Sequence, residues 1–174
     1  MIERFRAHPD DGVDPVLLVS SRPDSPAIPF AQQQGMAGLV LDRKSFRETD
    51  ALLTVLETEG VELIALAGFL WLVPTYLVRA FPDRILNIHP ALLPKYGGKG
   101  MYGAHVHRAV REAGEKESGI TIHYVNERYD EGTILHQSSV ALEETDTPED
   151  IAAKVQGLEH EHYWRVVREV AGKL

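Results

Sequence analysis

The sequence predicts an α/β fold with a mostly parallel sheet, and three observations support this prediction. Short apolar runs alternate along the chain with amphipathic stretches, a pattern typical of parallel strands covered by helices. Near the C-terminal end, two more polar runs are separated by only a few residues, which favours an antiparallel hairpin at one side of the sheet. The chain has 174 residues, of which 44% are hydrophobic and 25% charged, and this fits one globular domain.

Five segments have the composition of strands. Residues 15–20, 61–69 and 84–88 are almost continuously apolar, which predicts strands that are buried on both faces. Residues 119–127 and 133–142 carry more polar side chains and form the two strands of the predicted hairpin.

Helix signals lie between these strands. Ser45 and Glu48 match a capping box and predict a helix over residues 45–58, which Gly60 ends. Shorter helical segments are predicted at residues 2–8, 74–80 and 102–113.

The last helix has the strongest start signal. Thr147 is a good N-cap, Pro148 suits the first helical position, and Asp150 can complete the cap. Apolar residues then recur at helical spacing and predict one stripe that faces the core. This stripe consists of Ile151, Val155, Leu158, Val166 and Val170.

The composition argues against several classes of function. A formal net charge of −8 argues against a nucleic-acid partner, which would need clustered Lys and Arg. The absence of cysteine excludes disulfides and thiol nucleophiles and fits a reducing compartment. No apolar run reaches the ~18 residues of a membrane helix, and no signal-peptide pattern opens the chain. We therefore expect a cytoplasmic protein with a small-molecule partner.

An amide, an imidazole and a carboxylate stand out as candidate catalytic groups. Asn87 and His89 lie two positions apart in the string Asn-Ile-His-Pro, so their side chains point to one face of a predicted strand. They lie at the carboxyl end of this strand, where open α/β sheets bind ligands. Asp130 follows later in the string Asp-Glu-Gly. Taken alone, His89 is also compatible with a structural role, and Asp130 with a turn.

These three groups are the ones needed to move an acyl group directly onto an amine. The amide of Asn87 can donate a hydrogen bond to a developing oxyanion, and the imidazole of His89 can carry a proton. The carboxylate of Asp130 can orient and charge that imidazole. A carboxylate within ~4–6 Å is expected to raise the pKa of His89.

Four strings occur in the order found in a known family: residues 66–70 (LAGFL), 87–96 (NIHPALLPKY), 119–124 (GITIHY) and 130–132 (DEG). From about residue 10 onward the sequence resembles the folate-dependent formyltransferase family, and within it the phosphoribosylglycinamide formyltransferases. The resemblance implies a Rossmann-like three-layer formyltransferase fold. It also implies transfer of a formyl group from 10-formyltetrahydrofolate to the amine of N1-(5-phospho-D-ribosyl)glycinamide in de novo purine (IMP) biosynthesis, without a metal.

The same resemblance implies roles for particular residues. The catalytic residues are Asn87, His89 and Asp130. The folate donor is expected between the loop at residues 126–130 and the main chain of a second segment. The donor-binding residues are Arg47, Leu70, Trp71, Leu72, Val73 and Asn87. Trp71 stands where many members carry an arginine, so contacts near the folate tail are expected to differ. Gln156 and Glu159 on the last helix are expected to bind the glycinamide end of the acceptor.

The start of the chain departs from the family pattern. Members have a further βα unit whose glycine-rich loop binds the substrate phosphate. We expect residues 1–174 to form a single formyltransferase domain without this unit. An open sheet edge, pairing between copies and altered phosphate binding are the expected consequences. Residues 97–100 are glycine-rich but lack P-loop spacing, and the loop up to Gly103 is expected to act as a lid.

Two alternatives stay open. The chain could be a formyltransferase or deformylase that acts on another acceptor, such as a sugar amine, an aminoacyl-tRNA or water. It could also be an inactive, truncated folate-binding remnant. A metal site is not expected, because His105 and His107 do not share a helix face and nothing nearby completes a ligand set. His160 and His162 are expected to be solvated helix residues.

Overall fold

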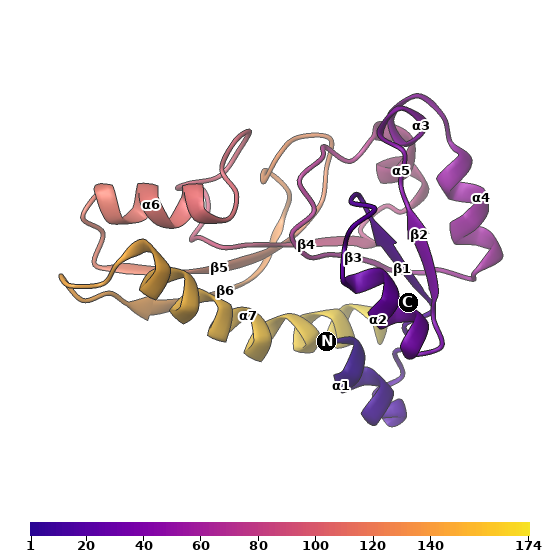
Figure 1. The fold of residues 1–174 in the computed structure, drawn as a ribbon, viewed down its shortest axis with the longest axis horizontal. Helices are drawn as coiled ribbons and strands as arrows, with labels where there is room; N and C mark the ends of the chain where they lie inside the picture. Colours follow the sequence, from indigo (N-terminus) through magenta and orange to yellow (C-terminus); the bar gives the residue numbers. More distant parts are fainter.

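The computed structural model describes residues 1–174 and has an α/β fold (Figure 1). The helices are α1 (Ile2–Ala7), α2 (Ala27–Gln33), α3 (Arg43–Glu48), α4 (Ala51–Thr58), α5 (Thr75–Ala80), α6 (Ala104–Glu112) and α7 (Pro148–Ala171), with a 3-10 turn η1 (Pro9–Asp11). The strands are β1 (Leu17–Ser20), β2 (Ala37–Val40), β3 (Ile64–Leu66), β4 (Ile85–His89), β5 (Glu117–Tyr124) and β6 (Ile134–Ala141).

The predicted α/β class is confirmed, and the six strands form two sheets. β1 and β2 pair in parallel, and β3, β4, β5 and β6 form a mixed sheet in that order. β3 and β4 are parallel, whereas β4 with β5 and β5 with β6 are antiparallel, so the predicted hairpin is present. The apolar run at residues 61–69 is strand only over its central part, and no element is predicted for α2 or β2. β2 is short, contains Gly38 and is largely exposed, so it has no long apolar run.

One predicted helix is divided in two. Residues 45–58 form α3 and α4, which are separated by Thr49 and Asp50. The predicted capping box at Ser45 is wrong, because Asp42 is the N-cap and its Oδ1 accepts the Ser45 backbone N–H at 2.8 Å. An aspartate at this position satisfies an unpaired N–H and also interacts favourably with the helix dipole. The helix therefore begins before the residue that the pattern indicates.

α7 begins as predicted. The Thr147 hydroxyl accepts the Asp150 backbone N–H at 3.2 Å, and Asp150 Oδ2 accepts the Thr147 backbone N–H at 2.9 Å. This pair of bonds completes a capping box. The predicted apolar stripe faces the core: Ile151, Val155, Val166 and Val170 are buried, and Leu158 packs against them. Although α7 has 24 residues, neither it nor any other helix is apolar and long enough to cross a membrane.

The two faces of β4 and β5 differ in character because successive side chains of a strand point to opposite faces. The apolar set packs with α6 and α7 in the main core and comprises Leu86, Ile88, Ile120 and Ile122. The polar set lies on the other face and comprises Asn87, His89, Thr121 and His123. The antiparallel register places Asn87 opposite His123, and His89 opposite Thr121. The polar face therefore gathers the chemically active side chains of both strands.

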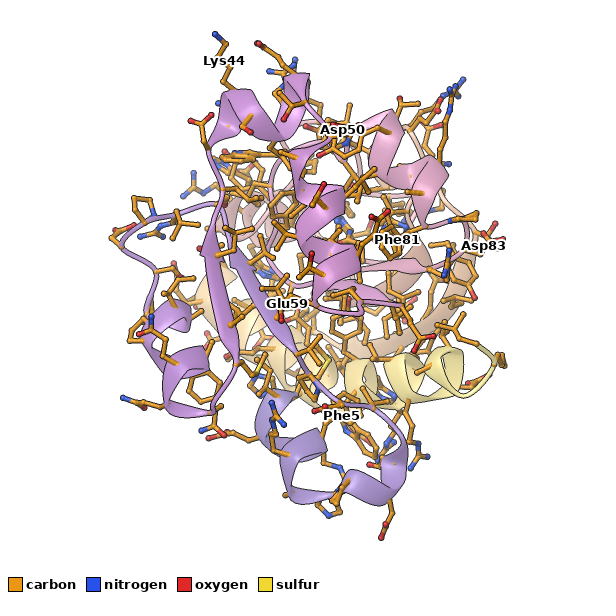
Figure 2. The ribbon with its side chains drawn as sticks, turned by 90° about the vertical axis from the view of Figure 1, so that its right-hand side faces the viewer. Phe5, Lys44, Asp50, Glu59, Phe81 and Asp83 are labelled. Atoms are coloured by element: carbon orange, nitrogen blue, oxygen red, sulfur yellow. The ribbon has the colours of Figure 1, made fainter.

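An apolar cavity of about 760 Å³ lies between the two sheets and is lined by all of β1 and β3. β1 pairs only with β2, and β3 pairs only with β4, so no backbone ladder joins the sheets across this cavity. Phe5 of α1 also lines the cavity and is buried in the core that includes α7 (Figure 2). The β1–β2 sheet is thus attached to the rest of the molecule mainly through side-chain packing.

Candidate active site

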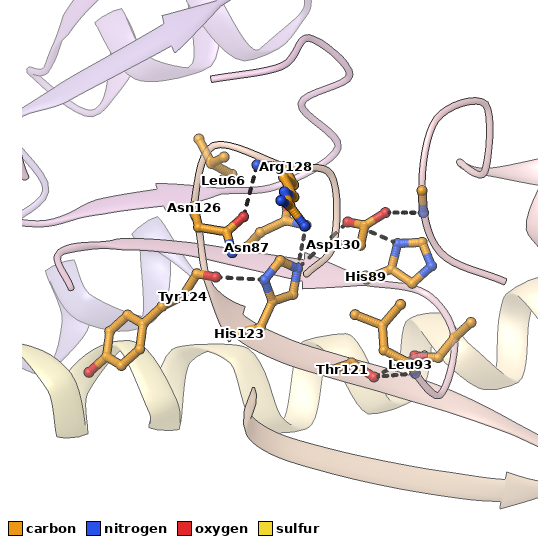
Figure 3. Close-up of polar contacts among 12 residues, drawn as sticks. Leu66, Asn87, His89, Leu93, Thr121, His123, Tyr124, Asn126, Arg128 and Asp130 are labelled. Carbon is orange, nitrogen blue, oxygen red and sulfur yellow. Dashed lines mark hydrogen bonds and ion pairs between the residues drawn. The ribbon is translucent and has the colours of Figure 1, made fainter. Parts of the chain in front are cut away.

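The Asn87 side chain is oriented by a histidine on the neighbouring strand (Figure 3). Asn87 Nδ2 lies 3.2 Å from His123 Nε2, and His123 Nδ1 lies 2.8 Å from the backbone carbonyl of Tyr124. A carbonyl oxygen can only accept, so Nδ1 of His123 donates and Nε2 accepts a hydrogen bond from the Asn87 amide. One N–H of Asn87 is used in this way, and the second is free to meet a ligand.

His89 is held at the end of β4 by a main-chain carbonyl. Its Nε2 donates to the carbonyl of Tyr96 at 2.7 Å, so Nδ1 is the unprotonated nitrogen of the neutral ring. Nδ1 lies 3.6 Å from Asp130 Oδ1, and the residue is only 3% exposed. A proton taken up at Nδ1 would therefore lie beside a carboxylate.

Asp130 lies between two imidazoles. Its Oδ1 is 3.6 Å from both His89 Nδ1 and His123 Nε2, and its Oδ2 accepts the Gly98 backbone N–H at 2.8 Å (Figure 3). The φ angle of Asp130 is +56°, in the left-handed region that Asp tolerates better than most residues. The loop after β5 therefore turns sharply and brings the carboxylate back over the polar face.

Burial and charge act in opposite directions on the pKa values of this cluster. Burial raises the pKa of Asp130, but the neighbouring His123, the Gly98 N–H and His89 together hold it below its usual value. Burial, together with a smaller effect of His123, lowers the pKa of His89 by more than Asp130 and the Tyr96 carbonyl raise it. Asp130 raises the pKa of His89 as expected, but the net pKa lies below its ordinary value because desolvation of the ring is the larger effect. His89 is therefore neutral beside an ionised Asp130 near neutral pH.

Polar side chains of β5 and β6 support the segment that follows His89. The Thr121 hydroxyl donates to the Ala91 carbonyl at 2.7 Å and accepts the Leu93 backbone N–H at 2.9 Å. Gln137 Nε2 donates to the Leu93 carbonyl at 3.0 Å and to the Thr121 hydroxyl at 2.9 Å. These bonds fix the chain on its way to Tyr96, whose carbonyl holds His89.

The predicted donor wall is an aromatic and apolar surface. The rings of Phe46, Phe69 and Trp71 pack against one another with centroid distances of 5.5, 5.7 and 5.8 Å. Leu70 and Leu72 beside them are 50% and 41% exposed. Val73, in contrast, is buried in the second apolar core, so its side chain is not available to a ligand and only its main chain can contribute.

Arg47 makes no contact with the catalytic cluster and lies on the exposed side of α3. It lines a surface depression together with Asp42, Arg43, Lys44 and Glu48, and Lys44 marks the exposed tip of the helix in Figure 2. Phe46 of the same helix packs on Trp71, and the Arg43 guanidinium lies 5.6 Å from the centroid of the Trp71 ring. α3 therefore places the guanidinium of Arg43 next to the aromatic surface.

The two predicted acceptor-binding residues of α7 differ in environment. Gln156 is exposed, whereas Glu159 is partly buried. Burial raises the pKa of Glu159, and the neighbouring His160 acts in the opposite direction. Neither side chain makes a hydrogen bond to the cluster of Asn87, His89 and Asp130.

Several site features lie beyond the sequence-based prediction. The Tyr96 carbonyl and the Gly98 N–H are main-chain groups, which every residue has, so no residue type could indicate them. The expectation for His162 is wrong, since its ring stacks on His136 with centroids 4.7 Å apart and it is partly buried. His160 is exposed as expected, and His107 is buried with no hydrogen-bond partner for Nδ1.

Comparison with known proteins decides the family. The family model described as formyl transferase matches residues 2–167, which is nearly the whole chain. The chain belongs to the formyl transferase family. Among its curated relatives, the chloroplastic phosphoribosylglycinamide formyltransferase of Arabidopsis thaliana is 48% identical over 159 residues, covering 88% of this chain and 54% of that protein. The phosphoribosylglycinamide formyltransferase of Bacillus subtilis is 36% identical over 160 residues, covering 90% and 80%.

Solved structures of this family have the same fold as the chain. Glycinamide ribonucleotide transformylase 1 from Symbiobacterium toebii superimposes with a TM-score of 0.87 at 32% identity, covering 99% of this chain and 81% of that chain. Phosphoribosylglycinamide formyltransferase from Brucella melitensis gives a TM-score of 0.85 at 33% identity, covering 98% and 87%. The Rossmann-like formyltransferase fold is thereby confirmed. The chain spans about half the length of the plant relatives it matches.

Proposed function

We propose that this member of the formyl transferase family transfers a formyl group from 10-formyltetrahydrofolate to the amine of N1-(5-phospho-D-ribosyl)glycinamide. The observation that carries the proposal is the cluster in which Asp130 bridges His89 and His123 while Asn87 presents an amide N–H beside them. The names of the relatives support this acceptor over a sugar amine, an aminoacyl-tRNA or water.

In this proposal, three side chains divide the chemical work. Attack of the amine on the formyl carbon moves negative charge onto the formyl oxygen, to which the free N–H of Asn87 donates. Such a contact contributes about 2.7–4 kcal/mol in comparable sites. The attacking nitrogen must lose a proton, and the neutral His89 accepts it at Nδ1. Asp130 then stabilises the imidazolium, which returns the proton to the nitrogen that leaves the formyl group.

The aromatic surface that follows β3 suits the folate donor, which supplies the formyl group. A flat heterocycle needs an apolar slot with a few polar groups, and Leu70, Trp71 and Leu72 offer this together with their main-chain N–H and C=O groups. The guanidinium group of Arg43 stands beside this surface, and Arg47 lies on the same short helix. They can pair with carboxylates of the folate tail.

The acceptor end of the site is assigned to α7. The carboxylate of Glu159 can accept a hydrogen bond from the glycinamide amine before attack, and Gln156 can hydrogen-bond to its amide. Holding both reactants in place converts a bimolecular reaction into an effectively unimolecular one, which is the main gain when no covalent intermediate forms on the enzyme.

Substitution of His89 and Asp130 by alanine tests the proposal. With both substrates saturating, each variant is expected to lose at least 100-fold in kcat, while the affinity for a folate analogue, measured by calorimetry, changes little. The matched control is His8→Ala, since His8 is an exposed histidine between α1 and η1. This variant should keep the full rate. If either alanine variant of the cluster keeps a near-normal rate, the assignment of that residue is wrong. If the parent chain forms product from neither this acceptor nor another, the proposed activity itself is wrong.

We also propose a cytoplasmic location and no nucleic-acid partner. The net charge of −8 argues against a nucleic-acid partner, and the absence of cysteine fits a reducing compartment. The two plant relatives are named chloroplastic, so fractionation of the source cells is the measurement that tests the location.

A further inference from the structure

Tyr163 of α7 makes a contact that connects three parts of the site. Its hydroxyl lies 2.8 Å from the carbonyl oxygen of Leu66 and 3.2 Å from that of Leu86. Leu66 ends β3, and Leu86 belongs to β4, next to it in the sheet. A phenol has one hydrogen, so it is shared between two carbonyls, with Leu66 as the nearer acceptor. The side chain is only 6% exposed.

The two carbonyls lead directly to groups that the proposed reaction uses. The peptide group of Leu86 continues into Asn87, whose amide is placed at the formyl oxygen. The peptide group of Leu66 continues into Ala67 and Gly68, where the segment that forms the donor wall begins. The Tyr163 hydroxyl therefore contacts two peptide groups. One leads into Asn87, which donates to the oxyanion, and the other leads into the segment proposed to bind the folate.

The same helix also carries the acceptor contact. Glu159 precedes Tyr163 by four residues, so the two side chains lie on one face of α7. Burial, and next the carboxylate of Glu159, raise the pKa of Tyr163, so its hydroxyl stays protonated and remains a donor at any working pH. The contact of Tyr163 thus sets the position of Glu159 relative to the strands that carry Asn87.

We propose that Tyr163 is a positioning residue. Through its shared hydrogen bond to Leu66 and Leu86, it aligns helix α7, which carries the acceptor-binding residues, with Asn87, which donates to the oxyanion, and with the segment that binds the folate. It touches neither reactant. The inference rests on the proposed formyl transfer, in which a small misplacement of amine against formyl carbon is costly: ~1 Å can reduce the rate ~100-fold.

Tyr163→Phe removes only the hydroxyl and keeps the ring in the core, so it is the decisive variant. With both substrates saturating, we expect kcat to fall about tenfold, while KM for donor and acceptor changes less than about threefold. Val170→Ala is the control, because Val170 is buried on the same helix and its side chain cannot hydrogen-bond to either carbonyl. It is expected to lower the thermal midpoint but to leave kcat within about twofold at a temperature where both variants are folded.

A double-mutant cycle asks whether Tyr163 acts through Asn87. In an Asn87→Ala background, Tyr163→Phe should reduce kcat clearly less than the tenfold expected in the parent, because one of the groups that it positions is absent. Losses that simply multiply, or a Tyr163→Phe variant with the parental kcat, would overturn the inference.

Hydrogen exchange gives a readout that does not depend on turnover. Tyr163→Phe should increase exchange in residues 67–73 and 87–89, and Val170→Ala should not do so selectively. Unchanged exchange in these segments contradicts the positioning role even if the parent chain proves inactive. An inactive parent with the selective increase would instead reject only the proposed function.

Discussion

Two buried imidazoles give this protein a defined response to acid. His89 is 3% exposed and His107 is 6% exposed, and burial lowers the pKa of both. In the unfolded chain each imidazole has an ordinary pKa of about 6.5. As the pH falls below that value, the unfolded chain takes up protons that the folded protein resists. The free energy of unfolding is therefore expected to decrease with falling pH, until the pH lies below the folded pKa values.

His107→Leu tests this at a residue that the reaction does not use. Because Nδ1 of His107 has no hydrogen-bond partner, the change removes a titrating group without breaking a bond at that nitrogen. Each unit by which folding lowers the pKa of an imidazole costs about 1.4 kcal/mol of stability once the pH is well below that folded pKa. The variant lacks this group, so its free energy of unfolding should decrease less than that of the parent between pH 7.5 and 5. Urea unfolding at the two pH values measures this, with His160→Leu as an exposed control. An equal loss in parent and His107→Leu would contradict it.

At the residue scale, the sequence alone predicts the positions of those side chains that follow from the alternation of faces along a strand. Asn87 and His89 share a face because they are two positions apart on a strand, and the antiparallel partner adds His123 and Thr121 to that face. The net pKa of His89 was not predictable, because it depends on how completely the ring is desolvated. That depends on the loops that cover it.

At the scale of elements, the loop between β5 and β6 determines where Asp130 stands. Gly132 closes this loop against the end of β5, and a Cβ atom at Gly132 would lie 1.6 Å from the Tyr124 carbonyl oxygen. The same carbonyl accepts the hydrogen bond of His123 Nδ1. Backbone atoms cannot move aside cheaply, so a larger residue at Gly132 must displace the loop and, with it, the Asp130 carboxylate.

Gly132→Ala is therefore expected to destabilise the protein by about 1–3 kcal/mol and to reduce turnover of the folded fraction at least tenfold. Urea unfolding and steady-state kinetics measure the two effects. Gly157→Ala is the matched control: a Cβ there meets no atom within 4 Å in the interior of α7, so it should stabilise by up to about 1 kcal/mol. A Gly132→Ala variant with parental stability and rate would show that the loop accommodates the methyl group.

The elements that the sequence predicted best are those with both a start signal and a stripe. α7 has a capping box at Thr147 and a continuous apolar stripe, and it begins where predicted. The segment at 45–58 has two competing start signals, and Asp42 takes the cap that Ser45 was expected to form. β2 lacks a recognisable pattern because it is a short, exposed edge strand, whose position depends on pairing with β1 rather than on its own side chains.

At the scale of the whole molecule, the division into two sheets was not predictable from local pattern. Apolar runs indicate strands, but they do not show which edges will be paired. β5 has a partner on each side, β4 and β6, whereas β1 has only β2 and borders the apolar cavity. Backbone ladders and buried side chains both resist local opening, and β1 has fewer of each, since all four of its residues are only partly buried.

We therefore expect the β1–β2 sheet to open separately from the sheet that carries the site. In native-state hydrogen exchange at low urea concentrations, the opening free energy of residues 17–20 should lie below that of residues 118–123 by roughly 2 kcal/mol or more. The difference should shrink as urea approaches the midpoint, where global unfolding exposes both sheets. If both segments exchange with one free energy and one urea dependence at all concentrations, the sheets unfold as a single unit. In that case the cavity between β1 and β3 does not weaken their coupling.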